Sequence, residues 1–260
     1  MLKFFSALIS IILSIFIARF YGAEYSGIYF FVIGAVLFLS TLCTFGIQPI
    51  LLKSVAVMKK NDLRLYFARI NFMIFCAFIV IISFLLILLK LVDFNNVLIS
   101  HYYPIILLAI PPNCFLLIFT NYFQAKHKFF LSIFSLTLGY QSVLIFICFL
   151  FSKNDANQLL INYNISIYIV FIVFLFFILR SKVPFITMDI NLFFIKTIIF
   201  SAVPFFIAQM SGQLLAFSGQ FILSCYVDSN YIAYYSVCMR VAIIMSFFVF
   251  AVNKVVAPKF

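Results

Sequence analysis

Residues 231–252 read YIAYYSVCMRVAIIMSFFVFAV, an apolar run with a single charged residue, Arg240, in its interior. About 20 apolar residues at a rise of 1.5 Å each cross a hydrocarbon core of roughly 30 Å. Backbone polar groups in lipid must be satisfied within the segment, so such a run predicts a helix. Seven further runs of similar length fill most of the chain: Phe4–Phe20, Ile28–Phe45, Ile70–Leu89, Tyr103–Phe123, Phe129–Phe151, Ile161–Leu179 and Thr197–Tyr226. The sequence therefore predicts an all-α polytopic membrane protein with about eight transmembrane helices.

The placement of the basic residues predicts the topology. The chain is 67% hydrophobic and only 9% charged, whereas soluble proteins carry about 25% charged residues. With a cytoplasmic N-terminus, 13 of the 17 lysines and arginines fall on the cytoplasmic side of the predicted helices, which follows the positive-inside rule. We therefore expect a multi-pass protein of the cell inner membrane with both termini in the cytoplasm. The net charge of +11 is explained by topology, and no nucleic-acid partner is expected.

The sequence offers little that could carry catalysis. All six acidic residues fall in predicted loops or at helix ends, and the outer loops are short. No zinc-protease motif, glycine-rich phosphate loop or paired carboxylates are present. The six cysteines lie inside apolar runs at spacings that suit neither a metal nor a disulfide framework. We predict that the protein is not an enzyme and needs no metal or cofactor.

Arg240 is the first candidate for a binding residue. It lies about 13 Å from the outer end of its predicted helix, where a charged side chain costs roughly 2.5–3.5 kcal/mol and is a functional candidate by default. No acidic residue of the chain is predicted at that depth. A guanidinium binds phosphate oxygens bidentately, so an anionic substrate is the expected partner. Arg19 and Lys53 are candidates for further positive charge, although ordinary interfacial anchors explain those two equally well.

Polar residues in the run Thr197–Tyr226 form a second candidate feature. Gln209, Gln213 and Gln220 lie within roughly 40° of one another on a helix turning by 100° per residue. Glutamine is unfavourable against lipid, so this face meets either neighbouring helices or a water-filled cavity. We favour the cavity because the next predicted helix carries Arg240. Pro204 in the same run and Pro111-Pro112 in the fourth run predict a kink and a break.

A short internal similarity relates the two ends of the chain. Residues 25–29, YSGIY, resemble residues 231–235, YIAYY, and each follows a short acidic turn. The same register pairs Gly34 with Arg240. Parallel repeats of this kind occur in transporters that bind substrate between two halves.

Several stretches resemble one transporter family in order and in predicted orientation. They are residues 18–29, ARFYGAEYSGIY, then Phe45-Gly46-Ile47-Gln48 with Lys53, and later residues 234–241, YYSVCMRV, followed by Val256-Ala257-Pro258. They resemble Wzx-type polysaccharide and O-antigen flippases of the multidrug/oligosaccharidyl-lipid/polysaccharide exporter superfamily. The basic residue at position 53 is often arginine in that family.

The resemblance implies a substrate and a site. The substrate would be an undecaprenyl-diphosphate-linked oligosaccharide, moved across the cytoplasmic membrane for O-antigen or capsule biosynthesis. Arg240 would hold the diphosphate with Arg19 as a second cation, and the Gln209, Gln213 and Gln220 face would bind sugar hydroxyls. The resemblance also implies two six-helix lobes around a cationic cavity.

The chain is shorter than that architecture requires. We expect a first lobe of six helices over residues 1–182 and the first hairpin of a second lobe over residues 183–260. A fragment of this kind would need a completing polypeptide or polysaccharide-assembly proteins as partners, besides the lipid-linked substrate and the bilayer. Three alternatives stay open: a cation-coupled multidrug exporter, which should carry a membrane-embedded carboxylate; a membrane-embedded polymerase or transferase of the same pathway, which should carry a long outer loop or a buried acid; and an inert remnant.

Overall fold

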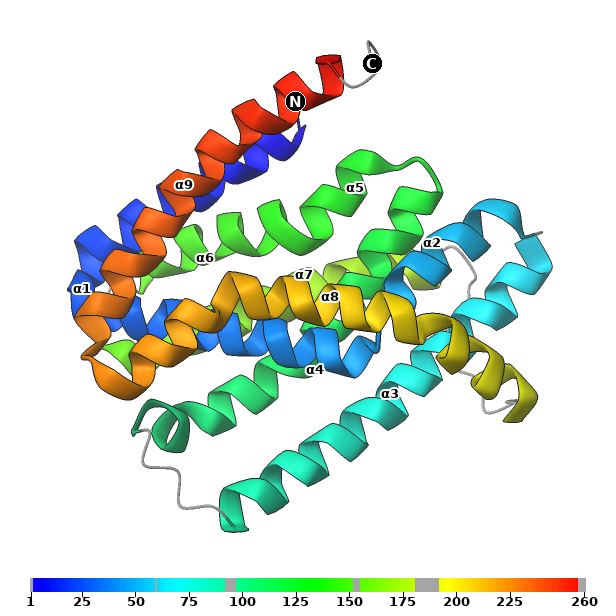
Figure 1. Cartoon of the computed structure of the whole chain (residues 1–260), viewed down its shortest axis with the longest axis horizontal. Coiled ribbons are helices and arrows are strands. Elements are labelled where there is room, and N and C mark those ends of the chain that lie inside the picture. Colours follow the sequence, from blue (N-terminus) through cyan, green and yellow to red (C-terminus); the bar gives the residue numbers. More distant parts are fainter. Residues whose placement is uncertain (1, 59, 92–96, 152–154, 181–191, 257–260) are drawn as a thin grey trace.

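The computed structural model describes residues 2–58, 60–91, 97–151, 155–180 and 192–256, with the side chains of 6–55, 58, 65–87, 101–151, 155–180 and 195–242. Every regular element in these residues is helical, as predicted (Figure 1). In chain order they are α1 (Leu2–Thr44), α2 (Ile47–Val57), α3 (Lys60–Leu91), α4 (Val97–Ala125), α5 (Phe129–Ile133), η1 (Phe134–Leu138), α6 (Gly139–Leu150), α7 (Ala156–Arg180), α8 (Leu192–Tyr226) and α9 (Ser229–Val256). The protein is an all-α polytopic membrane protein.

The predicted apolar runs coincide with these helices. Within the described residues, 6 helical segments are long and apolar enough to cross a membrane, and they overlap seven of the eight predicted runs to within two residues at each end. The longest, Ser6–Thr44, holds the first two runs. The eighth run lies in α9, whose side chains are described only as far as residue 242.

Helix α1 changes direction sharply at Gly22, where the sequence predicts a turn between two helices. Gly22 has φ 80° and ψ 173°, a conformation that is essentially restricted to glycine. A Cβ at this position would meet nothing within 4 Å, so backbone conformation alone imposes the glycine. We call the two parts the first half (residues 2–21) and the second half (residues 23–44) of α1, and their junction the elbow.

Helix α4 stays helical through three prolines, so the predicted break at Pro111-Pro112 is wrong. Pro112 cannot donate a hydrogen bond to the carbonyl four residues earlier, that of Leu108. The hydroxyl of Tyr168, in α7, donates to this carbonyl at 3.0 Å. The side-chain amide of Asn113 donates to the carbonyl of Ala109 at 3.3 Å. Neighbouring side chains that satisfy freed carbonyls allow a membrane helix to continue through proline.

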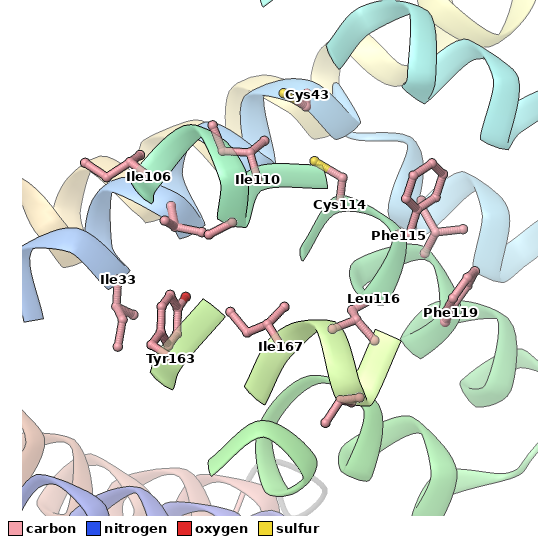
Figure 2. Close-up of a cluster of buried hydrophobic side chains, with 14 of the residues drawn as sticks. Ile33, Cys43, Ile106, Ile110, Cys114, Phe115, Leu116, Phe119, Tyr163 and Ile167 are labelled. Carbon is pink, nitrogen blue, oxygen red and sulfur yellow. The ribbon is translucent and has the colours of Figure 1, made fainter. Parts of the chain in front are cut away.

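Helix α1 lies at the centre of the packing. Its first half runs beside α9 and its second half beside α8, with both chain ends at the same end of the α1–α9 pair (Figure 1). The second half also packs on α4 and α7, and Figure 2 shows the resulting apolar core, with Ile33 and Cys43 from α1, Ile110 and Phe119 from α4, and Ile167 from α7. Because lipid tails are as apolar as these side chains, close van der Waals contact rather than the hydrophobic effect stabilises such a core.

Helix α2 packs one face against the bundle and leaves the other face exposed. Its apolar residues Ile47, Leu51 and Val55 are buried, and the helix contacts α4 and α8. One face of this helix is therefore anchored in the protein, and Lys53 lies on its exposed face.

Candidate functional site

Arg240 lies inside the angle of the elbow. It sits about 16 Å along α9 from Ser229, and its side chain is half-buried. One guanidinium nitrogen, Nη1, donates a hydrogen bond to the backbone carbonyl of Ser10, in the first half of α1, at 2.8 Å. The guanidinium carbon lies 4.5 Å from the centre of the Phe30 ring, in the second half of α1. The side chain therefore contacts both arms of the elbow.

These two contacts leave most of the guanidinium available. A cation over an aromatic face contributes about 2 kcal/mol when desolvated, and Phe30 covers one face of the group. Arginine carries five N–H donors, and one of them is used by Ser10. None of the Arg240 nitrogens is both buried and unpartnered among the described side chains. A guanidinium that presents two adjacent N–H groups can bind an anionic group bidentately.

The surroundings of Arg240 are polar but contain no buried acid among the described side chains. The acidic side chains that the structure describes, Glu24, Asp155 and Asp228, are all exposed. The phenols of Tyr29 and Tyr140 lie within electrostatic range of the guanidinium. Tyr29 is fully buried and its hydroxyl has no hydrogen-bond partner among the described residues. Neutral hydroxyl dipoles can stabilise the cation without cancelling its charge, so its attraction for an anion is retained.

The glutamines of α8 divide into two kinds. Gln220 is 8% exposed, and its amide donates to the hydroxyl of Ser236, in α9, at 3.0 Å. This is the interhelical packing role that the sequence left open. The side-chain oxygens of all three glutamines are buried without a hydrogen-bond donor among the described residues. Gln209 and Gln213 differ from Gln220 in being only half-buried as whole side chains.

Two predicted site residues are not brought to Arg240. Arg19 is exposed, lies about 13 Å along α1 from Ser10, and points to the opposite side of that helix because nine residues correspond to about 180°. Lys53 is exposed on α2, a helix that contacts α4 and α8. The structure therefore assembles the site from Arg240 with α1 rather than from three cations.

The internally similar positions meet in space. Gly27 packs against the carbonyl of Ser229, and a Cβ on Gly27 would fall 3.2 Å from the backbone nitrogen of Ala233, its counterpart in the register. Gly34, the counterpart of Arg240, lies against Gln220 and Phe217 of α8. One pair of equivalent positions, Gly27 and Ala233, is thus in contact, whereas Gly34 and Arg240 contact different helices.

Sequence reasoning missed Phe30 and Ser10. Phe30 is one of 39 phenylalanines, so nothing distinguishes it before the elbow brings it under Arg240. Ser10 takes part through its backbone carbonyl, which no side-chain pattern reports. Only the similarity of residues 25–29 to 231–235, which adjoin Phe30 and Arg240, hinted that these segments belong together.

Within the described residues, no three histidine, cysteine, aspartate or glutamate side chains are close enough to hold a metal ion. Comparison with curated proteins and with solved structures gives no match. The family model described as polysaccharide biosynthesis protein matches residues 1–260. The chain belongs to the polysaccharide biosynthesis protein family.

Proposed function

We propose that the protein is a flippase that moves undecaprenyl-diphosphate-linked oligosaccharide repeat units across the cytoplasmic membrane for surface polysaccharide, O-antigen or capsule. The observation that carries this proposal is Arg240, a guanidinium in an apolar helix that contacts one carbonyl and one ring and has no acidic partner among the described side chains. A diphosphate supplies the charge and the paired oxygens that a guanidinium can bind. The protein acts as a carrier and not as an enzyme, with both termini in the cytoplasm.

The carbohydrate part of the substrate would be bound by α8. The side chains of Gln209 and Gln213, which are half-buried, would bind sugar hydroxyls, and their buried oxygens, which have no donor among the described residues, would accept hydrogen bonds once side-chain rotation exposes them. Gln220 holds α8 against α9 through Ser236 and so positions this polar face. The substrate's head would lie between the elbow of α1 and the α8–α9 hairpin.

A multidrug exporter is supported less well. Export of a cationic drug in exchange for protons or sodium calls for a membrane-embedded carboxylate, and the described acidic side chains are exposed. A buried cation would also repel such a drug. The anionic substrate is the better match to the charge of the site.

Complementation of a flippase-deficient strain tests the proposal. We expect Arg240→Ala to lower surface polysaccharide about ten- to hundredfold, since a hydrogen bond to a charged group contributes about 1.5–3 kcal/mol. Arg240→Lys should retain part of the activity because it keeps the charge but loses the bidentate geometry. Arg19→Ala, which removes an exposed cation, serves as the matched control and should complement fully. Full complementation by Arg240→Ala at normal protein levels would disprove the role of the guanidinium.

A further inference from the structure

Three of the segments that can cross a membrane end or begin at one corner of the bundle. They are His101–Ala125, Phe129–Leu150 and Ala156–Arg180. The turn between α4 and α5 and the end of α7 therefore lie where these segments reach the membrane surface. Four basic side chains are exposed there: Lys126, His127, Lys128 and Arg180. We call these four residues the basic corner.

Helices α4 and α7 run side by side in the same direction, which brings Arg180 to the level of the α4–α5 turn. The hydroxyl of Tyr168 donates to the carbonyl of Leu108. Further along both helices, the ring centres of Phe174 and Phe123 lie 5.6 Å apart. Arg180 lies about 9 Å beyond Phe174 along α7. Packed helices are about 8–10 Å apart, a spacing that long basic side chains can reach across.

The α4–α5 turn has a defined backbone structure. The N–H of His127 donates to the carbonyl of Gln124 at 3.0 Å. The N–H of Lys128 donates to the carbonyl of Phe123 at 2.9 Å, which completes a Schellman motif. His127 has φ 57° at the left-handed position that glycine adopts most easily. An imidazole is thus held in the basic corner despite its backbone cost, and an outlier of this kind points to function.

The side chains of the turn combine positive charge with exposed aromatic rings. The ammonium nitrogen of Lys126, Nζ, lies 4.6 Å from the centre of the Tyr122 ring, a contact that orients the ammonium without neutralising it. Phe129 and Phe130, which begin the next membrane segment, are 51% and 59% exposed. Basic residues suit the headgroup region of a bilayer, and phenylalanine beside them suits the boundary with the acyl chains.

The acidic side chains that the structure describes lie far from the basic corner. Asp155 precedes the start of α7 and is about 37 Å from Arg180 along that helix. Glu24 lies within electrostatic range of Tyr102, near the start of α4. Asp228 lies in the α8–α9 turn, which packs against α1 near the elbow. The described side chains therefore leave the positive charge of the corner uncompensated.

We infer that the basic corner binds the phosphate headgroups of anionic phospholipids, on the cytoplasmic surface in the proposed topology. Its place at the ends of three membrane segments and its exposed phenylalanines favour a lipid over a soluble acidic partner. Each lysine or arginine near an anionic membrane surface raises affinity about fivefold. Bound headgroups would fix the depth and rotation of α4, α5 and α7, because interfacial cations anchor membrane helices. The inference does not involve Arg240 and is independent of the proposed function.

Lipid binding to the full chain in detergent, measured by native mass spectrometry, tests the inference. The probes are dioleoylphosphatidylglycerol, dioleoylphosphatidylcholine, inorganic phosphate and poly-L-glutamate. The two lipids share their acyl chains, so a difference between them isolates headgroup charge. We expect the anionic lipid to bind about a hundredfold more tightly, since two lysines and one arginine contribute about fivefold each. Inorganic phosphate and poly-L-glutamate at the same concentration should not displace it.

Paired variants separate the corner from the overall charge. Lys126→Gln with Lys128→Gln should weaken binding of phosphatidylglycerol about 25-fold and leave phosphatidylcholine unchanged. Lys53→Gln with Lys196→Gln removes two exposed lysines from α2 and α8 and should change neither lipid's binding more than twofold. Arg180→Gln should weaken phosphatidylglycerol about fivefold. Unchanged thermostability shows that each variant is folded, as these side chains are exposed.

Equal losses in the two double variants would mean that binding follows net charge alone and would overturn the inference. Equal affinity for phosphatidylcholine, or displacement by inorganic phosphate or poly-L-glutamate, would overturn it as well. Arg240→Met should bind phosphatidylglycerol as the unmodified chain does. If binding were lost in that variant, the lipid would lie at Arg240 and not at the basic corner. The complementation assay decides the proposed function separately.

Discussion

The two halves of α1 form two seams with the α8–α9 hairpin, and the seams differ at equivalent positions. In the seam between the second half and α8, Gly34 allows Gln220 and Phe217 to pack closely. In the seam between the first half and α9, the counterpart of Gly34 is Arg240, which keeps a charged side chain between the helices. Close packing of small residues is what stabilises helix pairs in membranes. The seam with α9 is nonetheless the more extensive of the two. The difference is therefore confined to the equivalent positions: one is closely packed, and the other holds the candidate binding residue.

Gly27, where the two seams meet, should be the most sensitive position. A Cβ there would overlap the carbonyl of Ser229, and backbone cannot move aside as a flexible side chain can. We expect Gly27→Ala to lower stability by about 3 kcal/mol, as overpacking does at its upper range. Thermostability in detergent, followed by size-exclusion chromatography of a fluorescent fusion, measures it. Gly212→Ala is the matched control: nothing lies within 4 Å of its Cβ, and it should gain about 0.5–1 kcal/mol. If Gly27→Ala and Gly212→Ala changed stability equally, the close contact between Gly27 and Ser229 would be contradicted.

Arg240→Met should remove function with little change in stability. Replacing a guanidinium by an apolar side chain removes a desolvation cost of roughly 2.5 kcal/mol on insertion scales. It also removes the contact with Phe30, worth about 2 kcal/mol, and the hydrogen bond to Ser10. Because these terms largely offset one another, we expect at most a small fall in thermostability together with loss of surface polysaccharide in the complementation assay. A large loss of stability would mean that the arginine is mainly structural, and the contrast between the two equivalent positions would fail.

Gly34→Ala tests the packed seam at the position equivalent to Arg240. The added Cβ would lie 2.9 Å from the side-chain oxygen of Gln220 and 2.9 Å from the Phe217 ring. Both neighbours are side chains that can shift, so the expected loss is smaller than at Gly27, about 1–2 kcal/mol. The same thermostability measurement applies. If the double variant Gly34→Ala/Gln220→Ala regains the stability that Gly34→Ala loses, the contact with Gln220 causes the loss. If the double variant stays as unstable as Gly34→Ala, the strain lies elsewhere.

The smallest change in stability is expected for substitutions of the glutamines in α8, and it should differ between Gln220 and Gln213. Gln220→Leu removes an interhelical hydrogen bond, for which membrane proteins show about 0.6 kcal/mol. Gln213→Leu removes a side chain whose oxygen has no donor among the described residues, so stability should not fall. In transport the order should reverse, because Gln213 is proposed to bind sugar. Identical profiles for the two variants would remove the distinction between them.

Much of the fold follows from hydropathy, since each apolar run became helix. The turn after the first run was predicted, and the structure places it at Gly22, whose backbone conformation hydropathy does not report. The exception is the predicted break in α4, which is prevented by a contact from a distant segment. Helix α4 passes through its prolines because Tyr168, far away in the chain, donates to the carbonyl that Pro112 leaves free. Such a partner cannot be predicted from the local sequence.

The sequence by itself determined the helices and the unusual status of Arg240, because the cost of exposing backbone or charge to lipid depends only on residue type and run length. It could not say which neighbours the guanidinium would meet, or that Arg19 would point away from it. The tertiary structure decided that Ser10 and Phe30 hold Arg240 at the elbow. Those contacts depend on how two helices cross, and crossing is set by packing between segments at opposite ends of the chain.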